Sequence, residues 1–572
     1  QEKGAAGIII YNTVSGDIKM NVGDTTIAVA SIRQDDGELL AAKSKGVLSI
    51  KRSQTSGPFM SDFSSWGPTP DLQLKPEITA HGGSILSAVP GQSYDRISGT
   101  SMATPNMSGV TALLRQYVKA SFPEIADDPV AVTAFVNQLL MSTTDIVYNT
   151  NGLPYSPRKQ GAGLANLVNS AATPAFIRTY DRKTGEVMDK SKIELGDDPS
   201  KTGVYVLKFA IRNFGSAALT YDISAIVMTE GVSETKTNQG ETTVTEQGYI
   251  LDGATVVVTS CTGGTANGNT VTVAGGKDAE LTVTITLDDA DKKYMDESFE
   301  NGMYVEGFLT LTAKEGTTVN LNAPFLAFYG DWTEAPIFDL DYFATNKDEL
   351  DDSIDLLDKT LPDAYATRPI GRVEGDYVNY MGSYYFIQDP AAKKIAADRK
   401  YISISNQEGA VNSVEYVWAG LLRNNEKITI TVTEDATGEV VYESVDTDVR
   451  KSFSNGTTII PSNIDVKFSA IEQQLKNNTA YTVTLKGYLD YDRDGEATNL
   501  NNTFTLPVVT DFESPALTDC EFYTEYDKSA KKTRLFAKMS VYDNHYAMCM
   551  QVGYVTLVDG EYQIKTFDRY LT

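Results

Sequence analysis

The sequence predicts a multidomain protein in which an α/β region is followed by antiparallel β-sandwich domains. In the first 176 residues, continuous apolar runs of strand length, such as "GIIIY" at 7–11, alternate with helical patterns. From about residue 177, strands with a period of two dominate, such as "VLKFAIR" at 206–212, and polar turns separate them. A chain of 572 residues is long enough for several domains, each with its own core.

Five segments follow from these changes in pattern. Residues 1–52 and 53–176 make up the α/β region, and residues 177–339 form a first β-sandwich. Residues 340–511 contain an irregular linker to about residue 400 and then a second sandwich. Residues 512–572 begin a third, Ig-like β-domain. Since both ends read as strands within domains, we expect this chain to be a segment of a longer protein.

The α/β region contains two strand patterns and three helical ones. The apolar runs at 7–11 and 25–32 suit strands covered on both faces, and 35–46 has helical spacing with a closing glycine. A longer helix is expected from about Ser101 through Leu114. Another is expected from Pro129, a residue suited to a first helical turn, through Met141.

The β region repeats a strand signal of period two. Apolar residues alternate at 219–223 and in "LTVTITL" at 281–287 in the first sandwich. The second sandwich has clear strands in "KITITVTED" at 427–435 and "AYTVTLKGYLDY" at 480–491. The charged run "DDADKKYMDESFE" at 288–300 is expected to be a solvated loop.

Charge and composition narrow the classes of partner. The formal net charge of −27 argues against nucleic acid and anionic membrane surfaces as partners. No stretch of eighteen apolar residues occurs, so no membrane span is predicted in this segment. The three cysteines form no disulfide framework and no zinc pattern. Cys520 and Cys549 fit either a disulfide pair or free thiols.

A candidate nucleophile lies in "SGTSMATPNMSGVTALLRQY" at 98–117. A serine hydroxyl such as that of Ser101 needs a base, and the chain has only two histidines, His81 and His545. At a helix N-terminus, unpaired N–H groups and the helix dipole stabilise a developing oxyanion. Gly99 would let a substrate backbone approach, and Pro105 suits the first turn. A buried helix with a capping serine explains the same spacing equally well.

Several short motifs resemble those of a known family. The block "GTSMATP" at 99–105, with "SG" after it, resembles the serine block of the subtilases. "FSSWGP" at 63–68, "KPEITAHGG" at 75–83 and "GAGL" at 161–164 resemble flanking elements of that family, in the same order. Residues 1–52 resemble the last half of a protease-associated domain inserted in the catalytic domain. Residues 177–339 resemble the fibronectin type III-like domain of lactocepin-type cell-envelope proteinases.

This resemblance assigns roles to the residues of the serine block. It implies a partial subtilisin-like catalytic domain in which Ser101 is the nucleophile and its own N–H is one oxyanion donor. Gly99, Thr100 and Met102 would form the loop around the nucleophile. The catalytic Asp and His and the oxyanion Asn would lie upstream of Gln1, because the inserted domain falls between that Asn and the Ser. The segment alone would then be nearly inactive.

The same resemblance implies a secreted or cell-wall bacterial hydrolase that acts on protein or peptide substrates. No cofactor is required for the chemistry. Any attachment to the cell wall is expected after Thr572, since no sorting signal falls within the chain. His81 stands where the family usually has Pro, which suits loop geometry better than proton transfer. His545 fits a surface or turn histidine of the third β-domain.

A weak metal-binding pattern occurs in "LDYDRDGEA" at 489–497. Asp490, Asp492 and Asp494 have the initial spacing of an EF-hand calcium loop. Asn501 occupies the twelfth position, where such loops have a bidentate Glu. "DG" between two strand patterns also predicts a hairpin turn, so structural calcium and a solvated acidic hairpin tip both stay open.

Two functions from different classes fit these observations. The first is a serine endopeptidase whose β-domains brace the catalytic domain and extend the substrate surface. The second is a catalytically inactive surface protein, a pseudoprotease that binds partners through its β-sandwiches. The intact block from Gly99 to Ala103, with Pro105, favours the endopeptidase.

Overall fold

The computed structural model divides into two compact units. Unit 1 comprises residues 1–67 and 74–330, and unit 2 comprises residues 68–73 and 331–572. In unit 1 the structure describes residues 7–11, 28–32, 34–42, 57–67, 74–236, 242–314 and 319–330. In unit 2 it describes 68–73, 331–338, 368–374, 377–380, 386–389, 394–397, 403–406, 414, 416–454, 459–460, 462–466, 470–471, 474–494, 503–514, 516–542, 549–558 and 561–570.

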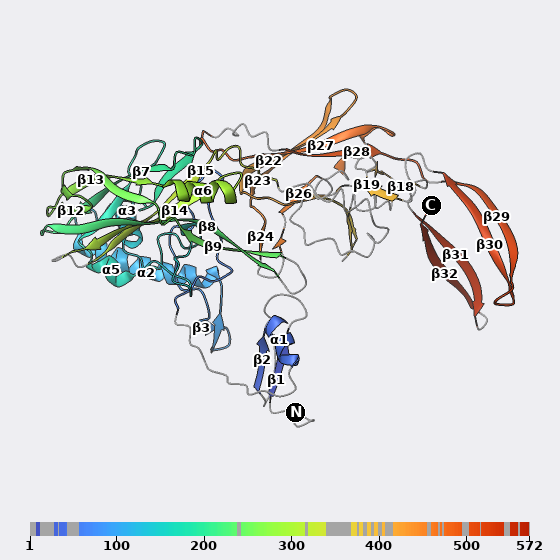
Figure 1. Ribbon diagram of the computed structural model, residues 1–572, viewed down its shortest axis with the longest axis horizontal. Helices are drawn as coiled ribbons and strands as arrows, with labels where there is room; N and C mark the ends of the chain where they lie inside the picture. The colour runs from blue at the N-terminus through green and yellow to red at the C-terminus, as the bar shows by residue number, and fades with distance from the viewer. Residues whose placement is uncertain are drawn as a thin grey trace. The chain divides into compact units, whose positions relative to one another are not determined.

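The first described residues form a small α/β element (Figure 1, blue). Strands β1 (Gly7–Tyr11) and β2 (Ala28–Ile32) pair in parallel, and helix α1 (Gln34–Ala41) packs against β1. The prediction that both faces of these strands are covered is wrong for β1. Ile8 and Ile10 are 42% and 40% exposed, because a single helix packs on the two-stranded sheet within the described part of the chain.

The next part of unit 1, residues 57–67 and 74–172, contains one hairpin and four helices. A hairpin of β3 (Ile85–Val89) and β4 (Ser93–Ile97) leads into the long helix α2 (Thr100–Ser121). Helix α2 therefore begins one residue before the predicted start and continues seven residues beyond Leu114. Three further helices follow, α3 (Pro129–Ser142), α4 (Pro157–Gln160) and α5 (Leu167–Ala172).

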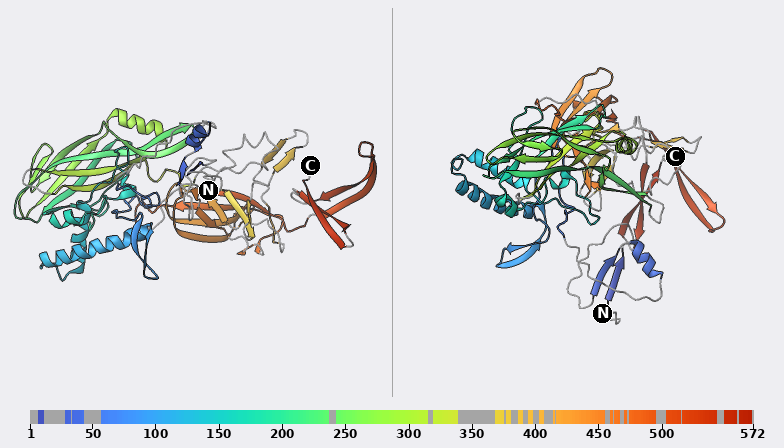
Figure 2. Two further views of the ribbon diagram at one scale, coloured as in Figure 1. Left: turned by 90° about the horizontal axis from the view of Figure 1, so that it is seen from below. Right: turned by 60° about the vertical axis from the view of Figure 1, so that its left-hand side comes forward.

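The residues at the N-terminus of helix α3 explain why its start is predictable from the sequence. Asp128 caps it, with Oδ1 accepting hydrogen bonds from Val130 N and Ala131 N at 2.9 and 3.0 Å. Pro129 occupies the first turn, where its missing N–H breaks no hydrogen bond. In Figure 2 (left) the helices between residues 100 and 172 lie together on one side of the sandwich.

The first sandwich of unit 1 contains two sheets. One has the order β10-β13-β7-β5, and the other has β11-β12-β8-β14-β15-β6 with β9 paired to β8. All pairs are antiparallel except β15–β6. The strands are β5 (Ala175–Thr179), β6 (Ile193–Asp198), β7 (Val204–Asn213), β8 (Leu219–Lys236), β9 (Thr242–Ile250), β10 (Thr255–Thr262), β11 (Thr265–Asn267), β12 (Thr270–Val273), β13 (Asp278–Thr286), β14 (Met303–Ala313) and β15 (Leu321–Tyr329).

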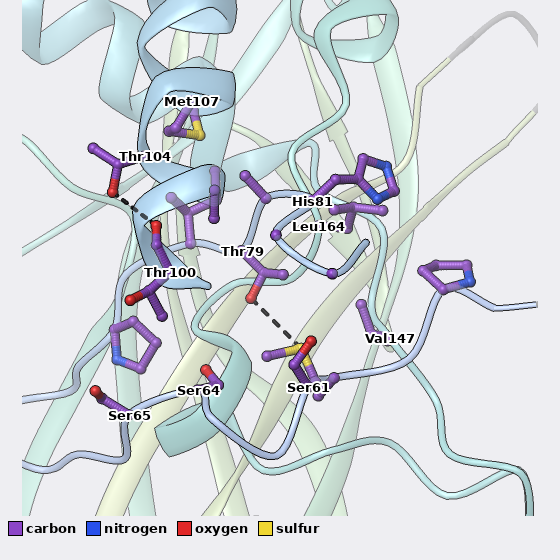
Figure 3. Close-up of a pocket in the computed structure, with 18 of the residues that line it drawn as sticks. Ser61, Ser64, Ser65, Thr79, His81, Thr100, Thr104, Met107, Val147 and Leu164 are labelled. Atoms are coloured by element: carbon purple, nitrogen blue, oxygen red, sulfur yellow. Dashed lines mark hydrogen bonds between the residues drawn. The ribbon is translucent and has the colours of Figure 1, made fainter. Parts of the chain in front are cut away.

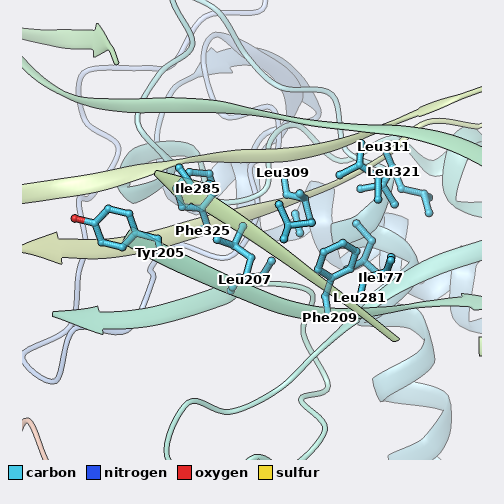
Figure 4. Packing of buried hydrophobic residues seen from close by; sticks show 14 of the residues in the cluster. Ile177, Tyr205, Leu207, Phe209, Leu281, Ile285, Leu309, Leu311, Leu321 and Phe325 are labelled. Atoms are coloured by element: carbon cyan, nitrogen blue, oxygen red, sulfur yellow. The ribbon is translucent and has the colours of Figure 1, made fainter. Parts of the chain in front are cut away.

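The core of this sandwich follows the predicted alternation. Leu207, Phe209 and Ile211 of β7 are fully buried, and they pack with Leu281 and Ile285 of β13 (Figure 4). Their burial between two sheets is what makes the segment fold as a sandwich.

Aromatic side chains connect the helices to this sandwich. Phe122, Phe135, Phe176 and Phe214 form a cluster in which the Phe122 and Phe135 ring centroids lie 4.7 Å apart. Phe176 belongs to strand β5 and packs in the same core as α2 and α3. The helical part and the sandwich therefore share a hydrophobic core.

The charged run at 288–300 forms a helix, α6 (Asp289–Ser298), so the predicted loop is wrong there. Asp288 Oδ1 caps the helix by accepting a hydrogen bond from Asp291 N at 2.8 Å. Met295 is buried in the sandwich core and provides the packing that stabilises this helix.

Unit 2 contains the second sandwich. Its sheets have the orders β17-β16-β21-β26 and β20-β28-β27-β22-β23. The strands of unit 2 up to residue 510 are β16 (Arg368–Glu374), β17 (Tyr377–Tyr380), β18 (Phe386–Asp389), β19 (Lys394–Ala397), β20 (Ser403–Ile404), β21 (Tyr416–Ala419), β22 (Asn425–Glu434), β23 (Val440–Val449), β24 (Phe453–Ser454), β25 (Ile459–Ile460), β26 (Ser462–Asp465), β27 (Ala480–Tyr488) and β28 (Thr503–Thr510).

The structure corrects the prediction of an irregular stretch up to residue 400. Strands β16 to β19 lie between residues 368 and 397, and β16 pairs with β21 of the second sandwich. Pro369 and Gly371 interrupt the apolar alternation of β16, which hides the strand in the sequence.

The last described strands form two hairpins. One pairs β29 (Ala516–Asp527) with β30 (Lys532–Tyr542), and the other pairs β31 (Cys549–Val558) with β32 (Glu561–Tyr570). Cys520 is a free, exposed thiol, so the disulfide alternative with Cys549 is not formed. Among the described helices, none is long and apolar enough to cross a membrane.

Candidate active site

Ser101 lies in the first turn of α2. Gly99 is the residue before the helix, and its carbonyl accepts hydrogen bonds from Met102 N at 3.0 Å and Ala103 N at 3.4 Å. Within the described part of the chain, no backbone carbonyl accepts a hydrogen bond from Thr100 N or Ser101 N. Two N–H donors at the positive end of a 22-residue helix are thus available beside the Ser101 side chain, which is exposed.

The start of α2 is tied to the loop that precedes β3. Gly99 N donates to the Gly82 carbonyl at 2.9 Å, and Ser84 N donates to Ser98 Oγ at 2.8 Å. A Cβ atom on Gly82 would lie 2.7 Å from the Gly99 carbonyl oxygen, so only glycine fits this contact. These bonds determine where the first turn of α2 begins.

A pocket of about 910 Å³ lies along one face of α2 (Figure 3). Eight α2 residues with helical spacing line it, namely Thr100, Ala103, Thr104, Met107, Ser108, Thr111, Ala112 and Arg115. Its other walls come from residues 58–61, 63–65, 76 and 78–83, together with Val147 and Leu164. Ser101 points from a neighbouring face of the same helix, because it falls outside this spacing.

The "GAGL" element connects the strands around this pocket. Leu164 forms β-bridges with Thr79 and Asp145. A Cβ atom on Gly161 would lie 2.3 Å from the Glu77 carbonyl carbon, and one on Gly163 would lie 2.5 Å from the Asp145 carbonyl oxygen. Three backbone segments thus approach more closely than any side chain would allow.

The two histidines take different places. His81 is exposed and lines the pocket on the side of Leu164 (Figure 3). No hydrogen bond of the described residues involves His81, and no carboxylate holds its imidazole as a triad would require. His545 lies outside the described residues.

Ionised side chains surround the "GAGL" element. Burial raises the pKa of Glu77, but the hydrogen bonds and charges of Lys190 and Lys75 outweigh it and hold that pKa below its ordinary value. The two ammonium groups thus keep Glu77 ionised beside the pocket wall, and Lys190 Nζ lies 2.9 Å from Glu77 Oε1.

A buried ion cluster lies behind the same element, and no pattern in the sequence predicts it. Arg158 is 3% exposed and forms ion pairs with Glu306 and Glu230. Burial lowers the pKa of Arg158, yet the charges of Glu306 and Glu230 reverse that effect and raise it. Glu230 and Glu306 lie 72 and 148 positions from Arg158 in the sequence, so no local motif connects the three residues.

The acidic run after β27 forms a turn as far as the structure describes it. Arg493 N donates to the Asp490 carbonyl at 2.9 Å, and both residues have positive φ. Asp492 and Asp494 follow in this turn, and the positions from 495 to 502 lie outside the described residues. No group of three or more His, Cys, Asp or Glu side chains arranged for a metal occurs in the described part of the chain. Calcium binding at Asp490, Asp492 and Asp494 stays a prediction.

Two family models match the chain. Residues 11–163 match the subtilase family, and residues 193–326 match an Fn3-like domain. The first match includes Ser101 and the pocket, and the second covers most of the first sandwich.

Curated relatives match along a larger part of the chain. A PII-type proteinase from Lactococcus lactis subsp. cremoris is 26% identical over 484 residues, which is 80% of this chain and 23% of that protein. A PIII-type proteinase from strain SK11 of the same subspecies is 30% identical over 364 residues, covering 59% of this chain and 17% of that protein. A C5a peptidase from Streptococcus pyogenes serotype M3 is 26% identical over 351 residues, covering 59% of this chain and 27% of that protein.

The chain thus spans between 17% and 27% of the length of these relatives. The predicted fold class, a helical and stranded catalytic-type segment followed by antiparallel β-domains, is confirmed by the two matches and by the strand pairing. Residues 11–163 thus form a subtilase segment, and an Fn3-like domain follows it at residues 193–326.

Proposed function

We propose that this chain is part of a serine endopeptidase in which Ser101 is the nucleophile. The place of Ser101 in the first turn of α2 is the observation that carries this proposal. There the N–H groups of Ser101 and Thr100 lack backbone acceptors within the described residues, and the helix dipole favours negative charge. The names of the relatives support a proteinase or peptidase that acts on protein or peptide substrates.

The chemistry is acyl transfer to Ser101. Its Oγ forms a bond to the peptide carbonyl carbon while its proton passes to a histidine, and the carbonyl oxygen becomes an oxyanion. The N–H of Ser101 donates to that oxyanion. Collapse breaks the C–N bond, and the amine leaves with the proton from the histidine. Water then attacks the acyl-enzyme, the histidine takes the proton of the water, and it returns a proton to Ser101 Oγ.

The histidine of this scheme is a residue outside the present chain. His81 lies on the far side of the pocket from Thr100 and has no carboxylate partner among the described residues (Figure 3). By the order of subtilase blocks, the Asp, the His and the oxyanion Asn precede Gln1. We accordingly expect the 572-residue chain to lack peptidase activity and the protein expressed from its full-length gene to have it.

The location proposed for this protein is outside the cell, secreted or at the cell wall. The chain carries a net charge of −27, which suits solubility in an open aqueous medium. The acyl-transfer chemistry requires no cofactor, and calcium at the turn after β27 would only stabilise the second sandwich.

Covalent labelling with a fluorophosphonate probe tests this function. In the protein from the full-length gene, we expect one label on the tryptic peptide that contains Ser101. Ser101→Ala should remove it, whereas Ser108→Ala should retain it, because the Ser108 hydroxyl donates to Thr104 O further along the same helix. A folded protein that takes no label would exclude an activated serine and favour the inactive surface protein.

A further inference from the structure

The loop from Pro157 to Ala165 contacts both walls of the pocket. On one wall, Gly67 N donates to the Arg158 carbonyl at 2.9 Å, and Ser64 Oγ donates to the Lys159 carbonyl at 3.4 Å. Ser64 and Ser65 line the pocket, and Gly67 follows Ser65 by two residues in the sequence. The backbone of Arg158 and Lys159 therefore holds this wall directly.

The second half of the loop holds the other wall. Thr79 N donates to the Gly163 carbonyl, and Ala165 N donates to the Thr79 carbonyl, both at 2.9 Å. Thr79 Oγ1 also donates to the Gln160 carbonyl at 2.9 Å. Thr79 precedes Gly82 by three residues, and the Gly82 carbonyl accepts the hydrogen bond of Gly99 N. A continuous set of backbone bonds thus leads from the loop to the first turn of α2.

The loop itself is held by one buried side chain that reaches into the Fn3-like sandwich. Arg158 Nε lies 2.9 Å from Glu306 Oε2, and its Nη2 lies 3.2 Å from Glu306 Oε1 and also pairs with Glu230. Glu306 belongs to β14 and Glu230 to β8, which are neighbours in one sheet. The guanidinium also lies over the Tyr304 ring, 3.9 Å from its centroid.

Burial makes this arrangement specific. Glu306 is 1% exposed, so its charge has no alternative partner in water. A bidentate pair between a planar guanidinium and a carboxylate fixes both the distance and the orientation of the two groups. The second carboxylate, that of Glu230, further restricts the orientation of the guanidinium. The sandwich thereby fixes the position of Arg158 more narrowly than apolar packing would.

We propose that Arg158 is a positioning residue through which the Fn3-like sandwich sets both walls of the pocket and the first turn of α2 beside Ser101. This inference rests on the proposed function, because it makes Glu306 and Glu230 contributors to a serine centre that they do not touch. The sandwich is then part of the machinery that orients the nucleophile, and its removal would disorder the pocket walls.

Glu306→Gln tests the inference with little change in shape. The amide retains an acceptor for Arg158 but removes the charge and one side of the bidentate pair. Asp296→Asn is the matched control, since it removes an ion pair of the same sandwich, between Lys201 and Asp296, that is exposed. Arg158→Lys is a second variant, which keeps the positive charge and loses the planar fork.

Amide hydrogen exchange of the 572-residue chain, followed by mass spectrometry, gives the first measurement. In Glu306→Gln we expect exchange about tenfold faster in peptides that contain Gly67, Thr79 and Gly99, with the β7 and β13 peptides unchanged. Arg158→Lys should show the same pattern, and Asp296→Asn should match the parent. Unchanged exchange at Gly67 and Gly99, or a uniform increase that includes β7 and β13, would overturn the proposal.

The rate of fluorophosphonate labelling in the protein from the full-length gene gives the second measurement. We expect Glu306→Gln to slow labelling of Ser101 about tenfold and to lower kcat for a peptide more than it changes KM. The fraction folded at the assay temperature, followed by circular dichroism, should stay that of the parent. Equal labelling rates in the variant and the parent would overturn the proposal. If the parent itself takes no label, the proposed function fails. The exchange pattern alone then decides whether Arg158 positions the pocket walls and the first turn of α2.

Discussion

Gly99 N donates a hydrogen bond to the Gly82 carbonyl across 2.9 Å, and no side chain separates the two residues. A Cβ atom at position 82 would lie 2.7 Å from the Gly99 carbonyl oxygen and 3.1 Å from Ala103 Cβ. The Gly99 carbonyl in turn accepts the first hydrogen bonds of α2. The glycine at 82 therefore determines how close the first turn of α2 comes to the pocket wall.

Gly82→Ala is expected to displace the first turn of α2. The added methyl group overpacks a contact made of backbone atoms, which costs about 1–3 kcal/mol in the free energy of unfolding. Labelling of Ser101 in the protein from the full-length gene should fall by at least about tenfold, because the nucleophile moves relative to its donors. Gly83→Ala is the control, since its Cβ would meet only Ser61 Oγ at 3.4 Å. Equal labelling of both variants would contradict this prediction.

Lys192→Met is expected to be strongly destabilising. Lys192 Nζ lies 2.7 Å from Glu194 Oε1, and both side chains are almost fully buried. Together they hold the backbone of Leu74, whose N–H donates to Glu194 Oε1 at 2.7 Å and whose carbonyl accepts from Lys192 Nζ at 3.1 Å. Loss of the ammonium leaves a buried carboxylate unpaired, a cost of about 3–5 kcal/mol. Urea unfolding followed by circular dichroism measures it.

A double-mutant cycle separates the ion pair from the backbone contact. Lys192→Met with Glu194→Gln should recover part of the stability lost in Lys192→Met, because the neutral amide needs no counter-charge. Lys201→Met is the control, since Lys201 pairs with Asp296 at an exposed site and its loss should cost less than about 1 kcal/mol. If Lys192→Met is no less stable than Lys201→Met, the buried pair contributes little to the free energy of unfolding.

Much of the fold was predictable because local pattern and tertiary environment agree. The alternation in β7 places Leu207, Phe209 and Ile211 in the core of the sandwich. The sequence signals of α3, an Asp cap followed by proline, correspond to the hydrogen bonds of Asp128 in the structure. Ser101 was expected at the start of a helix, and it lies in the first turn of α2.

Other features depend on contacts between distant residues, which no local pattern encodes. The charged sequence of helix α6 predicts a loop, because its acidic side chains hide the apolar contact of Met295 with the sandwich. Strand β16 exists because it pairs with β21, whose partner residues lie 46 to 50 positions further along the chain. The Arg158 cluster joins three residues from separate elements, so only the fold brings its charges together.

Asp291→Asn is expected to stabilise unit 1 near pH 7. Burial raises the pKa of the Asp291 carboxyl above its ordinary value of 3.8, and the charges of Asp288 and Asp252 raise it further. The folded state therefore binds the proton more tightly than the unfolded state, and the carboxyl favours folding only while it is protonated. That contribution is present below the ordinary pKa and is lost as the pH rises through the raised value. Asparagine keeps an acceptor for Gly253 N without the charge.

Urea unfolding at about pH 3 and about pH 7, on either side of the isoelectric region, measures this pH dependence. The advantage of Asp291→Asn over the parent should be present at the higher pH and absent at the lower one. Asp289→Asn is the control in the same helical turn. Asp289 is fully exposed, and its charge stabilises the N-terminus of α6, so this variant should be slightly less stable than the parent at pH 7. An equal effect of both substitutions would refute the role of burial.

Trp332→Phe is expected to release the segment Pro68–Gln73 within unit 2. The Trp332 indole is buried, and its N–H donates to the Pro70 carbonyl at 2.8 Å. The Arg423 guanidinium lies over the same ring, 3.6 Å from its centroid. Phenylalanine keeps a ring for Arg423 but has no donor for Pro70, a loss of about 1–3 kcal/mol.

Exchange of the Leu72 amide should accelerate accordingly, while Leu422→Ala at a half-exposed neighbour should leave it unchanged. Slow exchange at Leu72 in Trp332→Phe would mean that other contacts hold the segment, such as the hydrogen bond of Asn424 to the Pro68 carbonyl at 2.8 Å.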